Sequence, residues 1–246
     1  MAAARKQTLR QRVWDSLENS DAVLFPRPCH GRIPNCPGSA AACQHLLQMP
    51  EIQVARVVKV HPSIGAAALR TALVMAGKTV LVPPYPGASY LYLLLHRDLC
   101  PNQRSLEWAG DKREYMKWAR PLKLLEIPAV DVVIVATCVA APNGVRLGKG
   151  KGYGEVEWGI LTELGAAGAS VPVYTLCHDL QLVGSEELPE ELMESHDLPV
   201  DAIATPSGLV RCKRSAPKPS GVRWDLVGPD LEEDIGALRS PAALPW

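Results

Sequence analysis

The sequence lacks the features of secreted, membrane-spanning and nucleic-acid-coating proteins. The first 18 residues, "MAAARKQTLRQRVWDSLE", contain no apolar core of a signal peptide, and no run of about 18 apolar residues follows. Lys+Arg and Asp+Glu are 26 each, so the basic excess of a broad nucleic-acid surface is missing. The seven cysteines form no CxxC pair. Free thiols in a reducing compartment are therefore expected, and we predict a cytoplasmic protein.

Three of the cysteines recur at seven-residue intervals. They are Cys29, Cys36 and Cys43, and His30 and His45 lie nearby in the sequence. Cysteine and histidine are the usual ligands of zinc, but this spacing matches no common ligand pattern. Buried or unreactive thiols are the favoured interpretation, and a zinc site is the alternative.

What the sequence does have is an alternation of helical and strand patterns. Helices are expected over residues 5–19, 39–48, 67–77, 88–99, 155–168 and, as a short acidic helix, 186–195. Apolar strands are expected over residues 55–62, 79–85, 129–140, 171–178, 199–206 and 208–213. This alternation predicts an α/β fold with a Rossmann-like, mostly parallel sheet and helices on both faces.

Two proline-rich segments interrupt this alternation. Residues 25–38 contain four prolines, which excludes a regular helix or a central strand. After about residue 214 the chain turns to "SAPKPSGVRWDLVGPD". We therefore expect one α/β domain over residues 1–214 and a C-terminal extension over residues 215–246, packed through Trp224.

A glycine-rich basic loop follows the most apolar strand and precedes a helix. It reads "RLGKGKGYGE", from Arg146 to Glu155. Glycines let backbone N–H groups approach an anion, and a helix N-terminus favours negative charge. The spacing matches neither the Walker A pattern nor G-x-G-x-x-G. A polyphosphate site is the functional interpretation, and a flexible basic turn without a ligand is the structural one.

Acidic residues near this loop and near a later strand could bind a metal ion. Glu155 and Glu157 open the helix after the loop, where they either complement the helix dipole or, for Glu155, reach a magnesium ion. Asp197 and Asp201 stand at the entrance of a strand. They either complete the metal site or serve as a turn cap and a solvated charge.

Three motifs, in order, resemble the 5-formyltetrahydrofolate cyclo-ligase family. The loop "RLGKGKGYGE" resembles the family's ATP loop, R-x-G-x-G-x-G-Y-Y-D-R. Lys6 and Arg10 match an N-terminal K-x-x-x-R, and the segment 189–205 is close to P-x-E-x-H-D-x-P-V-D-x-I-x-T. The resemblance covers about residues 5–213. Relatives within the family carry an RNA-recognition module, but its sequence pattern is absent here, so we expect no nucleic-acid partner.

The resemblance implies an α/β fold and an ATP- and Mg-dependent reaction. In the family, the formyl oxygen of 5-formyltetrahydrofolate attacks the γ-phosphate of ATP, and ring closure with loss of phosphate gives 5,10-methenyltetrahydrofolate. The implied metal ligands are Glu155 and Asp197, and the implied catalytic residues are Lys149, Lys151 and Tyr153. The implied ATP-binding residues are Lys6, Arg10, Arg146, Gly148, Lys149, Gly150, Lys151, Gly152 and Tyr153.

Departures from the family pattern leave three functions open. Gly154, Glu155 and Val156 stand where the family has Tyr, Asp and Arg, and the segment "VKVHPSIG" lacks the family's folate-contacting acid. The first hypothesis is an active cyclo-ligase with ATP and a reduced folate as partners. The second is a nucleotide-binding sensor or interaction module without efficient turnover. The third is an ATP-dependent enzyme that acts on another substrate.

Overall fold

The computed structural model describes residues 2–84 and 86–235. Its strands are β1 (Val57–Val60), β2 (Thr79–Val82), β3 (Tyr92–Leu95), β4 (Arg120–Leu122), β5 (Val132–Val135), β6 (Val139–Ala140), β7 (Arg146–Leu147), β8 (Val173–Leu176), β9 (Ala202–Thr205) and β10 (Gly208–Arg211). Its α-helices are α1 (Ala2–Asn19), α2 (Ser39–Leu47), α3 (Pro50–Val54), α4 (Ala67–Met75), α5 (Gln103–Glu107), α6 (Lys112–Tyr115), α7 (Tyr153–Glu163) and α8 (Pro229–Asp234).

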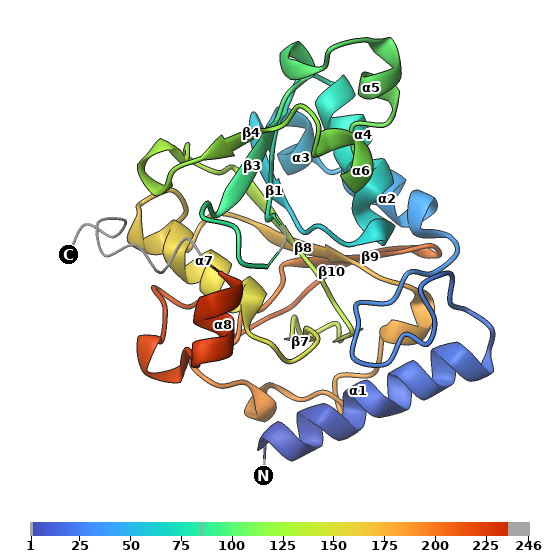
Figure 1. Cartoon of the computed structure of the whole chain (residues 1–246). Coiled ribbons are helices and arrows are strands. Elements are labelled where there is room, and N and C mark those ends of the chain that lie inside the picture. Colours follow the sequence, from blue (N-terminus) through green and yellow to red (C-terminus); the bar gives the residue numbers. More distant parts are fainter. Residues whose placement is uncertain (1, 85, 236–246) are drawn as a thin grey trace.

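Eight of these strands form one sheet in the order β10-β9-β8-β5-β1-β2-β3-β4 (Figure 1). The strands from β9 to β2 run parallel, while β10, β3 and β4 pair antiparallel at the two edges. Helices α2 and α4 cover one face, and α7 covers the other. The predicted Rossmann-like, mostly parallel α/β sheet is confirmed.

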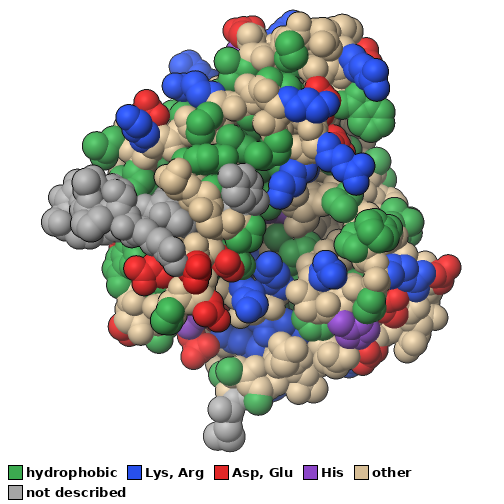
Figure 2. Space-filling view, viewed as in Figure 1, with side chains coloured by type: hydrophobic (Ala, Val, Ile, Leu, Met, Phe, Trp, Pro, Cys, Tyr) green, Lys and Arg blue, Asp and Glu red, His purple; other side chains and the backbone are tan. Residues whose placement is uncertain are grey.

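The order of the strands reverses beside β1. Strand β1 lies between β5 and β2, and the chain crosses it to reach β5. In sheets of this kind, ligands bind beyond the carboxyl ends of the strands where the order reverses. Figure 2 shows a hollow on this side of the molecule, with lysine and arginine side chains gathered inside it.

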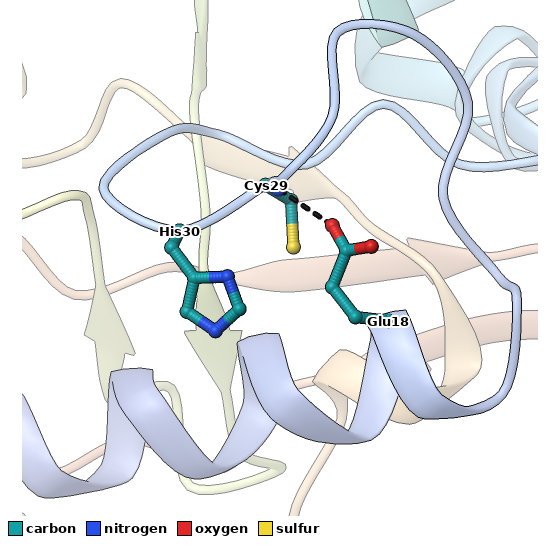
Figure 3. Close-up of side chains that lie close together, drawn as sticks. All are labelled: Glu18, Cys29 and His30. Atoms are coloured by element: carbon teal, nitrogen blue, oxygen red, sulfur yellow. Dashed lines mark hydrogen bonds between the residues drawn. The ribbon is translucent and has the colours of Figure 1, made fainter.

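Helix α1 and the proline-rich segment 25–38 pack on each other beside the sheet. The predicted apolar face of α1 is buried, through Leu9, Val13, Trp14 and Leu17. The segment forms neither a helix nor a strand, as expected. Glu18 accepts a hydrogen bond from the backbone N–H of Cys29, at 2.6 Å, and so ties the segment to the end of α1 (Figure 3).

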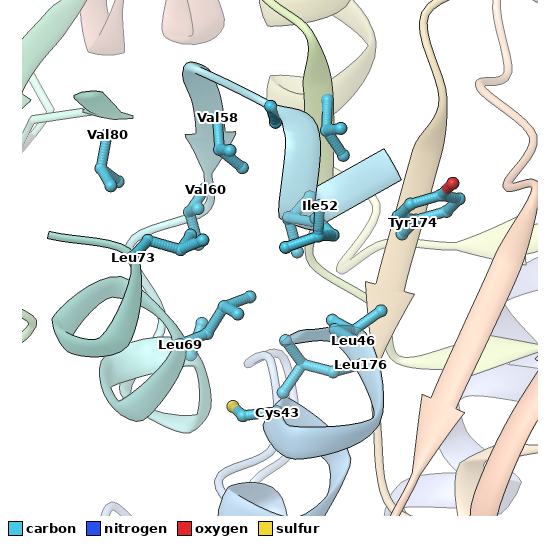
Figure 4. Packing of buried hydrophobic residues seen from close by; sticks show 14 of the residues in the cluster. Cys43, Leu46, Ile52, Val58, Val60, Leu69, Leu73, Val80, Tyr174 and Leu176 are labelled. Carbon is cyan, nitrogen blue, oxygen red and sulfur yellow. The ribbon is translucent and has the colours of Figure 1, made fainter. Parts of the chain in front are cut away.

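The core under α2 and α4 is built by alternation along the strands. Val58 and Val60 point into it, and Leu73 of α4 lies beside Val60 (Figure 4). Residue 59 between them must point to the opposite face, because successive side chains in a strand alternate. That residue is Lys59, which faces α7.

The prediction of a helix over residues 88–99 is wrong. This stretch holds β3, which pairs antiparallel with β2 and with β4, the latter itself not anticipated. A short leucine-rich run suits a buried helix and a buried strand equally well, so pairing with neighbours decides the outcome.

The acidic segment 186–195 forms only a single 3₁₀ turn over residues 190–192. The single strand expected over residues 129–140 is divided into β5 of the main sheet and β6, which pairs with β7 in a separate two-stranded sheet. The remaining expected helices and strands are present, most of them with shifted ends.

The extension after residue 214 packs closely on the domain as far as it is described. Lys218 is buried and pairs with Asp201 at 2.7 Å, and the Trp158 indole donates to the Pro219 carbonyl at 2.8 Å. Trp224 donates to Glu163 at 3.2 Å and stays more than a third exposed. The division at residue 214 stays a prediction, and its last part, residues 236–246, lies outside the described residues.

Candidate functional site

A cavity of about 430 Å³ opens at the carboxyl ends of β1, β2 and β5. His61, Pro83 and Ala136 line it, and each directly follows one of these strands. A volume of this size is typical of small-molecule sites. The cavity is also lined by all the residues that the sequence assigned to nucleotide and metal: Lys6, Arg10, Arg146, Gly148, Lys149, Gly150, Lys151, Gly152, Tyr153, Glu155 and Asp197.

The glycine loop presents its backbone and two lysines to the cavity. Gly150 and Gly152 have φ values of 89° and 77°, which non-glycine residues rarely adopt. Gly152 directly precedes α7, and no described side chain caps that helix start. Its first N–H groups therefore remain available for an anion. Lys149 lies over the Tyr153 ring, with Nζ 4.6 Å from the ring centroid.

Two buried arginines hold the loop in place from below. Arg10 of α1 donates from Nε to the Gly148 carbonyl at 2.7 Å. Arg146 donates from Nη1 to the Ala136 carbonyl at 2.7 Å and forms an ion pair with Glu155. Burial lowers the pKa of Arg10 from its usual value, and an arginine side chain keeps its charge in proteins. Both side chains thus add positive charge beneath the loop.

Lys6 lies between two carboxylates at the edge of the cavity. Its Nζ is 2.5 Å from Asp197 and 2.8 Å from Glu194. Burial alone would lower the pKa of Lys6, but the hydrogen bonds to these two carboxylates outweigh it and raise the pKa. Asp197 also accepts the Glu194 backbone N–H at 2.8 Å, so it caps a turn while it faces the cavity. Glu194 was not anticipated from the sequence.

The carboxylates form one candidate cation site. Glu194, His196 and Asp197 offer ligand atoms that all lie within 4.8 Å of one another. Glu155 lines the same cavity, but it pairs with Arg146 and is not part of that group. The ligand pair expected from the sequence is therefore only half present in this cluster, through Asp197.

Three buried polar residues that line the cavity, Lys59, Glu157 and His61, were not predicted as site residues from the sequence, and together we call them the polar floor. Lys59 of β1 and Glu157 of α7 form an ion pair, and both line the cavity. His61 also lines it, is 4% exposed, and has no hydrogen-bond partner for either ring nitrogen within the described chain. A signal was available in the sequence, because a lysine within the otherwise apolar strand "VVKV" is unusual.

Residues close to the end of the described chain complete one wall. Asp234 accepts a hydrogen bond from the Tyr153 hydroxyl, and its own carbonyl accepts the Gly87 N–H at 2.7 Å. Ile235 is 8% exposed and lines the cavity with Asp234. Burial, together with the hydrogen bond to Asp234, raises the pKa of Tyr153, so its hydroxyl stays protonated at neutral pH.

One other acidic candidate, Asp201, does not line this cavity. Asp201 pairs with Arg214 at 2.6 Å and with Lys218, and these charges keep its pKa low despite its burial. It ties the extension to the sheet and is not the solvated charge that was one of the two interpretations.

The cysteine series forms no common site among the described residues. Cys29 and His30 lie near Glu18, but Cys36, Cys43 and His45 are not in that group (Figure 3). Glu18 already pairs with the Arg27 side chain at 2.9 Å. The three cysteines are buried free thiols, as the favoured interpretation expected.

No helix within residues 2–84 and 86–235 is long and apolar enough to cross a membrane.

Comparison with known proteins assigns the chain to a family. The sequence model of the 5-formyltetrahydrofolate cyclo-ligase family matches residues 2–206. The methenyltetrahydrofolate synthase domain-containing proteins of Mus musculus and Homo sapiens are 34% and 33% identical to it, each over 96% of this chain. The match covers 62% and 61% of those proteins, so the chain spans about three fifths of the length of these curated relatives.

A solved structure supports the fold. The structure of Aquifex aeolicus 5,10-methenyltetrahydrofolate synthetase superposes with a TM-score of 0.53, at 18% identity, and covers 86% of this chain and 94% of that one. At this identity the likeness concerns the fold alone.

Proposed function

This chain belongs to the 5-formyltetrahydrofolate cyclo-ligase family, and on that premise we propose that its cavity binds Mg-ATP and a reduced folate. The proposed reaction converts 5-formyltetrahydrofolate and ATP to 5,10-methenyltetrahydrofolate, ADP and phosphate. The formyl oxygen takes the γ-phosphoryl group, and attack by the neighbouring folate nitrogen then expels phosphate. A cytoplasmic location remains a prediction from the sequence.

One observation carries this proposal: the residues assigned to the nucleotide come from α1, β7 and the glycine loop, and all face one cavity. Phosphoryl transfer needs mainly positioning and neutralisation of charge. The loop N–H groups and the start of α7 would bind the phosphates, while Lys149 and Lys151 would neutralise them. Arg10 holds the Gly148 carbonyl and Arg146 holds the Glu155 side chain, so the two arginines fix the shape of the loop.

The carboxylate cluster has the chemistry that magnesium requires. Mg²⁺ prefers a few carboxylate oxygens together with phosphate and water. Asp197 and Glu194 would provide the carboxylates, and Glu155, which lines the same cavity, is a further candidate ligand. The ion would neutralise charge on the phosphates. Lys6 already neutralises Asp197 and Glu194, so it would have to turn toward the phosphates when the ion binds.

The direct test is formation of the methenyl product. Purified protein is mixed with 5-formyltetrahydrofolate, Mg²⁺ and ATP, and the absorbance of 5,10-methenyltetrahydrofolate is followed with time. Turnover that requires ATP and is lost in the Lys149→Ala/Lys151→Ala variant supports the proposal. Absence of product under conditions in which ATP binds would end it.

A second function is favoured by one observation. The carboxylates near the loop are already paired, Glu155 with Arg146 and Asp197 with Lys6. A protein that binds nucleotide without efficient turnover has no need to release them for a metal. In that case ATP would bind with nearly equal affinity with and without Mg²⁺, and the chain would act as a sensor or interaction module. An ATP-dependent reaction on another substrate remains the third hypothesis.

A further inference from the structure

The polar floor of the cavity contains a buried ion pair, Lys59–Glu157, which is unusual against the face of an otherwise apolar sheet. Lys59 is 1% exposed and pairs in register with Leu81 of β2 and Val133 of β5, both in the apolar core under α7. Removing an ion pair from water is costly, and an apolar pair of similar size is often as stable or more so. Stability of the fold therefore gives little reason for Lys59 and Glu157 to be charged.

The position of this pair divides the lining of the cavity. Strand β1 lies between β5 and β2. The glycine loop follows the β5 side through β7, whereas Pro83, Pro84 and Leu91 follow β2 and give the cavity an apolar wall. Glu157 reaches the space between them from α7. A carboxylate beside an apolar wall suits a flat heterocycle with N–H groups along one edge.

His61 adds a second polar group to the same floor. Burial, reinforced by the charges of Arg70 and Lys59, holds its pKa well below the usual value, so the ring is neutral at neutral pH. A neutral imidazole has one donor and one acceptor nitrogen. Buried polar atoms without partners are rare in folded proteins, because a buried donor or acceptor that has lost its water and gained no partner destabilises the fold. Both ring nitrogens thus have capacity for a ligand that enters the cavity.

We propose that Glu157, held by Lys59, is the residue that selects the heterocycle, and that it accepts hydrogen bonds from the 2-amino group and ring N–H of a pterin-like edge. The inference rests on the proposed function, whose substrate carries such an edge, and it assigns recognition to a residue at the centre of α7. The ion pair with Lys59 holds the Glu157 carboxylate in place, and His61 is placed to bond polar atoms of the ring that Glu157 does not reach.

The test compares two ligands that differ only at that edge. Pterin carries the 2-amino group, and lumazine carries an oxygen there, which would face the carboxylate as a second acceptor. Isothermal titration calorimetry should show that the wild-type protein binds pterin at least about tenfold more tightly than lumazine. Glu157→Gln should remove most of that preference, because the amide presents one acceptor atom in place of two. ATP affinity should change by less than about twofold, since Glu157 does not belong to the glycine loop.

Two further variants serve as controls, one for the loss of a carboxylate in general and one for loss of folding. Glu191→Gln removes an exposed carboxylate outside the cavity and should leave the preference intact. Glu157→Gln leaves Lys59 buried without its counter-charge and could unfold the protein. The double variant Lys59→Met/Glu157→Met replaces the pair with apolar side chains of similar size, so it should fold and bind the two pteridines equally. Retention of the preference in either floor variant, or its absence from the wild-type protein, would overturn the inference.

The outcome is separable from that of the proposed function. A wild-type protein that prefers pterin but forms no methenyl product keeps this inference and ends the proposed reaction. A protein that forms the product with an unchanged KM for the folate in Glu157→Gln keeps the reaction and ends this inference.

Discussion

The two sides of the cavity are built on opposite principles. The glycine loop is one continuous basic stretch that acts largely through its backbone, and Lys149, Gly150 and Lys151 at its centre are exposed at the mouth of the cavity. The floor is assembled from β1 and α7, with Lys59 and Glu157 buried almost completely. Substitutions of the exposed loop lysines leave the core intact, whereas Lys59 and Glu157 are themselves part of the core. We therefore expect loop substitutions to affect binding and floor substitutions to affect stability as well.

The largest effect is expected from the floor. Lys59→Met alone leaves Glu157 buried without a counter-charge, which should lower the free energy of unfolding by about 3–5 kcal/mol. Urea unfolding followed by circular dichroism measures this loss. Adding Glu157→Met should restore most of it, because the uncompensated charge is gone. A single variant as stable as the wild-type protein would mean that the floor is not energetically part of the core.

Loop substitutions should show the opposite behaviour. Lys149→Ala/Lys151→Ala removes two exposed charges that would face the phosphates, so ATP affinity should fall by about 30- to 100-fold, or about 2–3 kcal/mol. The midpoint of urea unfolding should stay within the error of the wild-type value. Lys117→Ala/Lys123→Ala, which changes net charge equally at exposed sites outside the cavity, is the matched control. Equal ATP affinity in the two double variants would remove the loop from the nucleotide site.

Asp197 should behave as an intermediate case. Asp197→Asn removes a charge that both pairs with Lys6 and belongs to the carboxylate cluster. We expect the gain in ATP affinity on adding Mg²⁺ to shrink about tenfold, with a modest loss of stability. ATP titrations with and without Mg²⁺ measure it. If the Mg²⁺ effect is the same in both proteins, Asp197 is only a turn cap and the partner of Lys6.

The smallest effect is expected at the wall formed by the extension. Asp234→Asn keeps a hydrogen-bond acceptor for the Tyr153 hydroxyl but removes its charge, so ATP affinity should change by only about threefold. Asp234→Ala should weaken binding further, and Tyr153→Phe should match it if the two act through one hydrogen bond. Additive effects of Asp234→Ala and Tyr153→Phe in the double variant would show that they act separately.

The same contrast explains how much could be predicted from the sequence. The loop residues could be found because they are consecutive and have an unmistakable composition, and the sheet because helical and strand patterns alternate. Strand β3 was mistaken for a helix because "YLYLLL" has no clear period, and only its pairing with β2 and β4 makes it a strand. The Lys59–Glu157 pair joins residues 98 positions apart, so spacing alone could not bring them together. Glu194 was passed over in favour of Asp197 for a similar reason, because their approach to Lys6 depends on how α1 packs.

The contacts of residues 229–235 also affect where the protein can safely be cut. The family match ends at residue 206, yet Asp234 and Ile235 line the cavity, and Leu231 packs so close to Gly152 that an added Cβ there would lie 3.1 Å from it. A fragment trimmed to residues 2–206 would keep the motifs that identify the family but would lose part of the cavity lining. Activity and binding assays of this protein should therefore use chains that reach at least residue 235.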